Sequence, residues 1–280
     1  MHIETGYAKV LAASFIWGTL GAFARWSGLL PFELSFFRLL VAALTLFAVL
    51  PREQRLIIFY TRQYPLVFIS GLLFAVDCLL FFHALKLTTL SNAVLPYNMQ
   101  PVIIAVLAPV FLRESLRPVH IRALVLSLVG LGLLIYPSLT ALSYQDLLGL
   151  TLALGGAFCL SVIALIIKAL DVRASTFVYY MTVIATVCLL PFTWLISPSS
   201  LGLHSILLVS VIGLIHTAVA YILYYSGLRS VNTQYAAALT YFIPVVAVLS
   251  GVIFFGEHIS FFTLTGGTLI IINSITVLFS

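Results

Sequence analysis

Charged residues are scarce in this 280-residue chain. Only 8% of its residues are Asp, Glu, Lys or Arg, whereas a soluble domain typically carries about 25%. Because 62% of the residues are hydrophobic and the mean hydropathy is +1.20, the chain cannot build a water-exposed surface. The composition therefore excludes a cytosolic enzyme, a secreted disulfide scaffold and a nucleic-acid-binding protein. It indicates an integral membrane protein whose main partner is the lipid bilayer.

Motifs for catalysis, metal binding and nucleotide binding are also missing. Cys78, Cys159 and Cys188 lie in apolar runs without a C-x-x-C pair, so we interpret them as packing residues. No H-E-x-x-H spacing or His/Asp cluster indicates a metal, and no G-x-x-x-x-G-K motif indicates nucleotide binding. We therefore expect no cofactor, no metal and no enzymatic activity.

Ten apolar stretches approach the roughly 20 residues that a membrane-spanning helix needs. The first is too long for a signal-peptide core, so we interpret it as a retained helix. The loops are too short to hold a separate domain outside the bilayer. The expected spans are 7–25, 31–50, 65–86, 91–112, 119–137, 146–170, 174–196, 203–227, 232–255 and 260–279.

Basic residues are distributed unequally between the two sides of these spans. If the spans alternate in direction, ten Lys and Arg residues fall on the side of the N-terminus, and only Arg25 and Lys86 fall on the other. The ten are Lys9, Arg52, Arg55, Arg62, Arg113, Arg117, Arg122, Lys168, Arg173 and Arg229. Because Lys and Arg concentrate in cytoplasmic loops, we predict that both termini are cytoplasmic. The formal charge of +5 then needs no acidic partner.

An internal repeat relates the two halves of the chain. When the sequence is shifted by 143 positions, Pro101 and Glu114 meet Pro244 and Glu257. This predicts two five-helix repeats, residues 1–138 and 139–280, within one integrated membrane domain. Because five is an odd number of spans, the second repeat is expected to be inverted in the membrane. Inverted repeats are typical of secondary transporters, whose substrate site lies between the repeats near the midplane.

Short motifs add a family resemblance to this pattern. They are Trp17-Gly18, Phe37-Arg38-Leu39, Pro101 with Glu114, and Pro244 with Gly256-Glu257. With the length and the repeat, they resemble the EamA type of the drug/metabolite transporter (DMT) superfamily. The resemblance implies a multi-pass secondary transporter that exports small organic metabolites, such as amino acids or related amines, or drugs. We expect it in a plasma membrane, as in the bacterial inner membrane.

Two charges lie well inside the expected spans, away from the span ends, although a charge at the bilayer centre costs at least about 2.5–3.5 kcal/mol. Asp77 and Arg38 are both expected roughly 10–14 Å below the outer surface, so we predict that they approach each other. One interpretation makes Asp77 a substrate-binding residue and Arg38 a structural or gating residue. The alternatives are a purely structural ion pair and an Arg38 that extends outward to the interface.

Aromatic, amide and imidazole groups form a second candidate set. His216 lies in the middle of its span, where it can carry a proton or bind a substrate. The other predicted substrate-binding residues are Trp17, Tyr97, Asn98, Gln100, Tyr221 and Tyr241. Around a central cavity they would suit a partly apolar solute, including an ammonium group held over an aromatic face. For each tyrosine, core packing or interface anchoring is the alternative interpretation.

Two prolines are expected in the middle of spans, where each removes a backbone donor. Pro101 and Pro244 are therefore predicted hinges of alternating access, with fixed kinks as the alternative. Glu114 and Glu257, just beyond their spans, are expected to cap helices or tie them together. An intramembrane enzyme and a gated channel are the alternative functions. Proton coupling through Asp77 or His216, exchange, facilitated transport and a homodimer all remain open.

Overall fold

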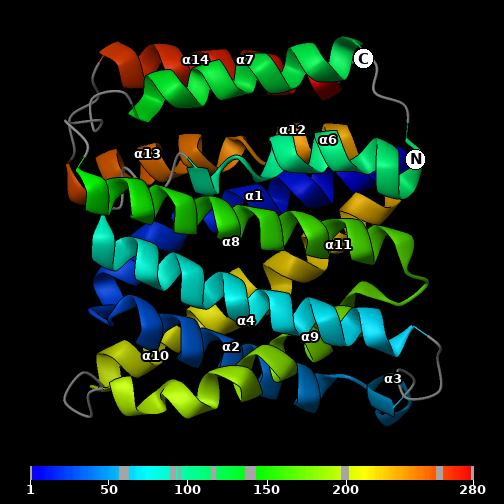
Figure 1. The fold of residues 1–280 in the computed structure, drawn as a ribbon, viewed down its shortest axis with the longest axis vertical. Coiled ribbons are helices and arrows are strands. Elements are labelled where there is room, and N and C mark those ends of the chain that lie inside the picture. Colours follow the sequence, from blue (N-terminus) through cyan, green and yellow to red (C-terminus); the bar gives the residue numbers. More distant parts are fainter. Residues whose placement is uncertain are drawn as a thin grey trace.

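The computed structural model describes residues 2–56, 63–88, 93, 96–114, 118–135, 143–196, 202–256 and 261–278. The regular elements of this part are helices (Figure 1). The first half contains α1 (His2–Ser27), α2 (Pro31–Val49), α3 (Arg52–Leu56), α4 (Tyr64–Leu87), α6 (Gln100–Leu112) and α7 (Pro118–Ile135). The second contains α8 (Tyr144–Ala169), α9 (Ala174–Leu189), η3 (Leu190–Leu195), α10 (Leu203–Val211), η5 (Ile212–Val219), α11 (Ala220–Ser230), α12 (Thr233–Leu239), α13 (Phe242–Phe255) and α14 (Phe261–Leu278).

Seven helical segments of the described chain are long and apolar enough to cross a membrane. They are Glu4–Ser27, Pro31–Val49, Tyr64–Leu87, Tyr144–Ala169, Ala174–Leu195, Leu203–Ser230 and Thr233–Phe255. Each lies at an expected span, and α6, with 13 residues, and α7 and α14, with 18 residues each, occupy the positions of the other three. The prediction of an all-helical, multi-pass membrane protein is confirmed.

The outer surface of the bundle is apolar. Large side chains such as Val110 on α6 and Ile253 on α13 are 76% and 72% exposed. In water such exposure would be costly over a whole surface, whereas lipid is an equivalent environment for these side chains. The exposed apolar side chains are therefore the expected boundary with the bilayer.

Helices of the two halves pack against each other in matching pairs. In the first half α4 packs on α8, and in the second half its equivalent α11 packs on α1. Likewise α6 packs on α8 and α13 packs on α1, while α7 and α14 lie side by side at one edge of the bundle (Figure 1). α1 begins and α14 ends at the same end of the bundle. Each half therefore completes its packing with helices of the other.

The fourth helix of each half is broken at the same place. Turn residues interrupt the chain at 98–99, before α6, and at 240–241, before α13. Pro101 is thus the second residue of α6 and Pro244 the third of α13, which are first-turn positions where a missing N–H is tolerated. The expectation that these prolines lie in mid-helix is wrong, because each half-helix begins just before its proline. Both half-helices also end alike, with left-handed residues at Arg113 (φ 56°) and Gly256 (φ 64°).

Small residues on α1 and α8 allow neighbouring helices to approach closely. Gly18 faces α13, where an added Cβ would lie 2.9 Å from the carbonyl oxygen of Ile243. Gly149 faces α4, where a Cβ would lie 2.7 Å from Thr88 Cγ2. Gly18 and Gly149 are therefore positions of close helix packing.

The eighth expected span contains an irregularity. Between α10 and α11, eight residues form the π-helix η5, which includes Gly213 and His216. Gly213 lies directly against α2, since a Cβ there would approach the carbonyl oxygen of Arg38 to 2.9 Å. π-Helical turns are rare and frequently occur at functional sites. This one places His216 beside α1 and α2 in the centre of the bundle.

Candidate functional site

Asp77 lies in the middle of α4 and is only 1% exposed. Its Oδ2 accepts a hydrogen bond from the Tyr97 hydroxyl at 3.3 Å. Its other oxygen, Oδ1, points toward α8 at Gly156, where a Cβ would lie only 2.8 Å away. Because Gly156 has no side chain, α8 leaves room at this position for both the Asp77 carboxylate and the Tyr97 ring.

Arg38 reaches the same region from α2. Its guanidinium is close enough to interact electrostatically with Asp77, Tyr97 and Tyr221. The Cys78 thiol lies next to it. Within the described residues no ion pair of 4 Å or less joins Arg38 to Asp77. Arg38 and Asp77 therefore lie in the same region without forming a direct ion pair. The direct hydrogen-bond partner of Asp77 is Tyr97.

His216 ties the π-helix to α1 through two contacts. Its backbone carbonyl oxygen accepts a hydrogen bond from Trp17 Nε1 at 2.9 Å, and its Nε2 lies 3.1 Å from the Thr19 hydroxyl. The Phe23 ring packs on the imidazole, with ring centroids 4.9 Å apart. His216 is also within electrostatic range of Arg38. The imidazole is therefore held in position between α1 and α2.

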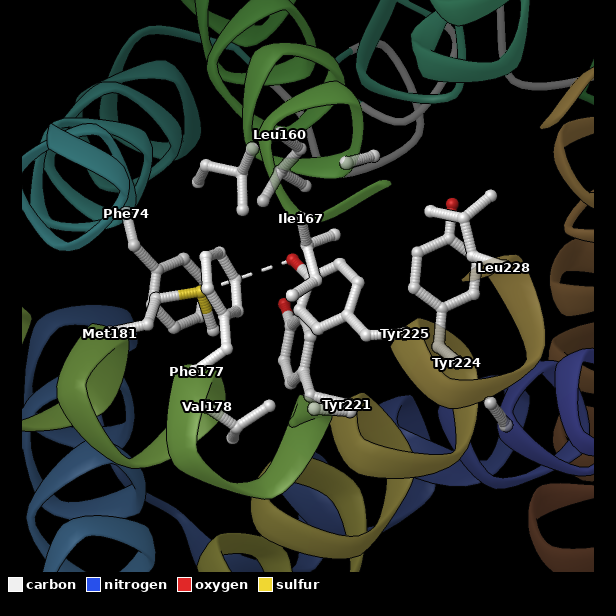
Figure 2. Packing of buried hydrophobic residues seen from close by; sticks show 14 of the residues in the cluster. Phe74, Leu160, Ile167, Phe177, Val178, Met181, Tyr221, Tyr224, Tyr225 and Leu228 are labelled. Carbon is white, nitrogen blue, oxygen red and sulfur yellow. Dashed lines mark hydrogen bonds between the residues drawn. The ribbon is translucent and has the colours of Figure 1, made fainter. Parts of the chain in front are cut away.

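Aromatic rings connect these polar groups. Trp17 packs against Tyr221 and Tyr224, with centroid distances of 4.9 and 5.2 Å. Tyr221 also contacts Phe74 of α4 at 5.3 Å. Figure 2 shows the tyrosines of α11 meeting apolar side chains from α8 and α9, including Met181, whose sulfur accepts a hydrogen bond from Tyr225 at 3.9 Å. One wall of the region is thus densely packed and apolar.

We define the central cluster as Trp17, Arg38, Asp77, Tyr97, His216 and Tyr221. Four buried atoms within it or on neighbouring elements have no hydrogen-bond partner among the described residues: Asp77 Oδ1, His216 Nδ1, Tyr224 Oη and Tyr241 Oη. Such groups are costly away from water, and native structures normally satisfy them with protein, water or a ligand. The unpartnered atoms mark the centre of the bundle as a place where a polar molecule can bind.

The remaining predicted site residues lie at the helix breaks. Asn98 lies in the break before α6, Gln100 is the first residue of α6, and both are half-buried. The Gln100 carbonyl oxygen accepts a hydrogen bond from Ser161 of α8 at 3.2 Å. Tyr241 lies in the equivalent break before α13 and is 1% exposed. The breaks thus bring predicted residues of both halves into the interior.

Several participants were absent from the sequence-based set. Thr19 and Gly156 contribute to the site through partners on other helices, which single-sequence periodicity does not reveal. Gln234 on α12 is 1% exposed, and within the part of the chain that the structure describes neither polar atom of its side chain has a hydrogen-bond partner. The sequence signal for Gln234 was an amide side chain within an apolar span, the same signal by which Asn98 and Gln100 were predicted.

Of the two glutamates expected to tie helices, Glu114 is within the described residues. Its carboxylate accepts hydrogen bonds from the backbone N–H and the hydroxyl of Thr233, at 3.1 and 2.8 Å. The prediction of a helix-capping tie is confirmed for Glu114. Glu257 lies outside the described residues.

A multi-pass helical bundle with a polar and aromatic centre is an architecture found in membrane transporters. The EamA-like transporter family model matches residues 4–136 and 147–279, and the chain belongs to this family, within the DMT superfamily. The family consists of non-enzymatic transporters, so the expectation that the protein is not an enzyme is also confirmed.

Individual relatives agree with this assignment. The chain is 33% identical to the uncharacterized transporter YwfM of Bacillus subtilis over 267 residues, covering 90% of this chain and 86% of YwfM. It is 24% identical to the pseudopaline exporter CntI of Pseudomonas aeruginosa over 285 residues, covering 98% of this chain and 95% of CntI. A solved crystal structure with 19% identity aligns with a TM-score of 0.78 over 96% of this chain and 94% of that chain, which shows a shared fold.

Proposed function

We propose that this protein is a secondary transporter that exports a small organic molecule with an ammonium group, such as an amino acid or a related amine. It has ten spans in two inverted five-helix repeats, with both termini cytoplasmic, in a bacterial plasma membrane. The substrate binds at the central cluster and reaches either side by alternating access. Export is supported by the resemblance to the pseudopaline exporter, whereas the class of substrate is argued from the site.

One observation carries the substrate class: Asp77 Oδ1 is buried at the bundle centre without a partner. An ammonium group is the complementary ligand for a desolvated carboxylate, because it supplies both a charge and donors. Arg38 lies in the same cluster but at more than 4 Å, so Asp77 remains available. Tyr97, Tyr221 and Trp17 add ring faces, which favour cations and apolar substituents.

A thermal-unfolding experiment with three matched compounds tests this proposal. L-Phenylalanine carries an amine and a carboxylate, phenethylamine only the amine, and 3-phenylpropionate only the carboxylate. A ligand that binds only the folded state stabilises it by about 2.7 kcal/mol at 100 times its Kd. We expect the two amines to raise the unfolding temperature of the purified protein and 3-phenylpropionate to leave it unchanged.

Variants then assign the effect to the carboxylate. Asp77→Asn should abolish the shift caused by phenethylamine, because the neutral amide keeps the shape but lacks the charge. Asp171→Asn is the matched control, since the side chain of Asp171 is 98% exposed. An equal shift by 3-phenylpropionate, or an undiminished amine effect in Asp77→Asn, would contradict the proposal.

A further inference from the structure

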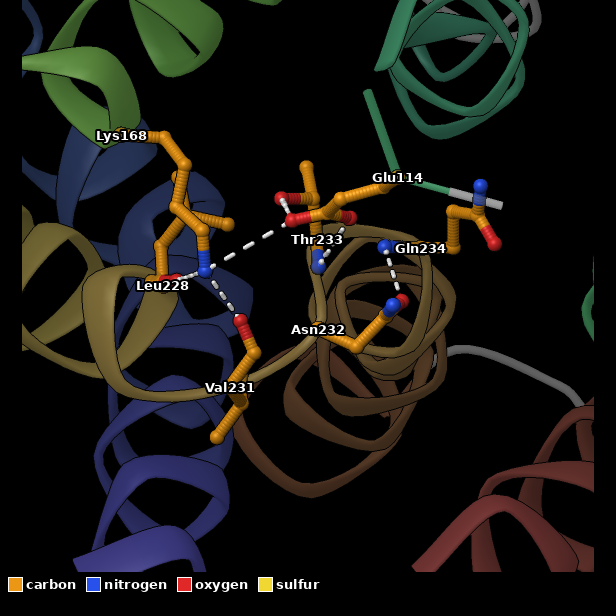
Figure 3. Close-up of polar contacts among 7 residues, drawn as sticks. All are labelled: Glu114, Lys168, Leu228, Val231, Asn232, Thr233 and Gln234. Carbon is orange, nitrogen blue, oxygen red and sulfur yellow. Dashed lines mark hydrogen bonds and ion pairs between the residues drawn. The ribbon is translucent and has the colours of Figure 1, made fainter. Parts of the chain in front are cut away.

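Charged side chains outside the central cluster meet at one end of the bundle (Figure 3). Glu114 follows α6, Lys168 is in the last turn of α8, and both reach the junction at which α11 ends and α12 begins. This is also the end at which α1 begins, because an added Cβ on Gly6 would lie 2.5 Å from Val231 in the same junction. It is therefore the end that the distribution of basic residues predicts to be cytoplasmic.

Glu114 and Lys168 supply hydrogen-bond partners for the backbone groups at the start of α12 and at the end of α11, respectively. Glu114 accepts hydrogen bonds from the first residue of α12, Thr233, while Lys168 Nζ donates to the carbonyl oxygens of Leu228, at 2.8 Å, and Val231. The acid thus lies at the N-terminus of one helix and the base at the C-terminus of the other, as the helix dipoles favour. Lys168 Nζ and Glu114 Oε1 are 3.8 Å apart, so the contacts form one connected unit.

This unit crosses between the halves of the chain. Glu114 belongs to the first half, whereas Lys168 and the α11–α12 junction belong to the second. Moving the halves apart at this end would break the bonds between Glu114 and Thr233 and separate Glu114 from Lys168. Another charged pair at this end, Arg229 with Asp171 at 3.5 Å, lies wholly within the second half and would move as one body.

The other half carries a related arrangement at the opposite end. A shift of 143 positions relates Lys168 to Arg25, and Arg113 to Gly256. Arg25 is in the last turn of α1, and its guanidinium lies 4.2 Å from the ring centroid of Phe255, at the end of α13. A cation at the end of the first helix of each half thus approaches the end of the broken helix of the other half.

We propose that Glu114, Lys168 and the α11–α12 junction form an inner gate, which must open before the central cluster is accessible from the cytoplasmic side. The gate rests on the proposed alternating access but is independent of the substrate. It makes Glu114 and Lys168 positioning residues for transport, because they act through the junction and do not touch the central cluster.

Cys78 is a native reporter for this gate. It is 4% exposed and lies beside Arg38 in the bundle centre, so its reactivity measures access to the central cluster. A membrane-impermeant methanethiosulfonate reagent is applied to inside-out and right-side-out vesicles, and labelling of the Cys78 peptide is quantified by mass spectrometry. The readout needs no substrate, so failure of the amine proposal would leave it interpretable.

Glu114→Gln keeps the size of the side chain and loses its charge. In inside-out vesicles we expect Cys78 of this variant to be labelled on the order of tenfold faster, which corresponds to a shift of about 1.4 kcal/mol in the gating equilibrium. Lys168→Met should act in the same direction. Asp171→Asn, the control within one half, should label like the unmodified protein.

Two results would overturn the gate. One is unchanged Cys78 labelling in both Glu114→Gln and Lys168→Met while each variant retains a cooperative thermal transition. The other is an equal increase from both sides of the membrane, which would indicate general loosening of the bundle. If Glu114→Gln does not fold, Lys168→Met alone decides between these outcomes.

Discussion

Gly156 occupies a position of α8 at which a single methyl group would disturb both members of the Asp77–Tyr97 pair. An added Cβ would lie 2.8 Å from Asp77 Oδ1 and 3.1 Å from the Tyr97 ring. Since closely packed interiors do not absorb such contacts without displacement, the carboxylate and the ring must shift. We predict that Gly156→Ala weakens amine binding by about tenfold, equivalent to about 1.4 kcal/mol, measured by titration of the purified protein with phenethylamine.

The neighbouring glycine supplies the control for this experiment. A Cβ on Gly155 would meet only Leu80 Cδ1, at 3.1 Å, which is the end of a flexible side chain that can move aside. Gly155→Ala should therefore bind phenethylamine as the unmodified protein does. Equal losses in the two variants would show that the rigidity of α8, and not the position of Asp77, determines binding.

At the residue scale, the sequence identifies which charged residues lie inside the membrane better than it identifies their hydrogen-bond partners. Asp77 and Arg38 stand out because charges inside apolar spans are rare, and the structure places both in the bundle centre. The hydrogen bond from Tyr97 to Asp77 was not predicted, since it depends on how the chain crosses from α4 to the break before α6. The assignment of substrate contacts to the central cluster remains a prediction.

At the scale of elements, the crossing of α1 and α13 depends on Gly18. A Cβ there would lie 2.7 Å from Val246 Cγ1 and 2.9 Å from the Ile243 carbonyl oxygen, and the backbone of α13 cannot rotate away as a side chain can. We predict that Gly18→Ala destabilises the protein by about 1–3 kcal/mol, the usual cost of overpacking. A lower midpoint in thermal or denaturant unfolding in detergent measures this effect.

Gly21, one turn further along α1, has no atom within 4 Å of an added Cβ. Gly21→Ala should be neutral or stabilising by roughly 0.5–1 kcal/mol, because alanine favours the helix. The prediction for the α1–α13 crossing is wrong if Gly18→Ala unfolds at the same midpoint as Gly21→Ala.

Helix positions were predictable and helix irregularities were not. Apolar run length located the spans, since the bilayer demands a minimum length of apolar helix. The π-helix at Ile212–Val219 leaves the composition of its span unchanged, so nothing in the apolar pattern reveals the wider turn. The breaks at 98–99 and 240–241 precede the prolines because a proline inside a helix lacks the N–H and its ring clashes with the carbonyl group four residues earlier, so the disruption falls on the N-terminal side.

For the whole molecule, the orientation in the membrane makes a prediction that fusions can test. The proposed arrangement of five spans in each repeat, with a cytoplasmic N-terminus, predicts that position 138 is external and the C-terminus cytoplasmic. Alkaline phosphatase, which folds only outside the cytoplasm, should be active when fused after residue 138 and inactive when fused after residue 280. Green fluorescent protein should show the reverse pattern, and identical behaviour at both positions would contradict the inverted repeat.

The exchange of packing partners between the halves also has a consequence for synthesis. α1 leaves the ribosome long before its partners α11 and α13, and α4 is made before α8 and α9. The helices of the first half are thus made before the helices that cover their small-residue contact faces. These faces become buried in the protein only when the second half is inserted. Each half expressed alone would leave these faces uncovered. Co-expression of the two halves in one membrane therefore offers a complementation assay for the native contacts between them.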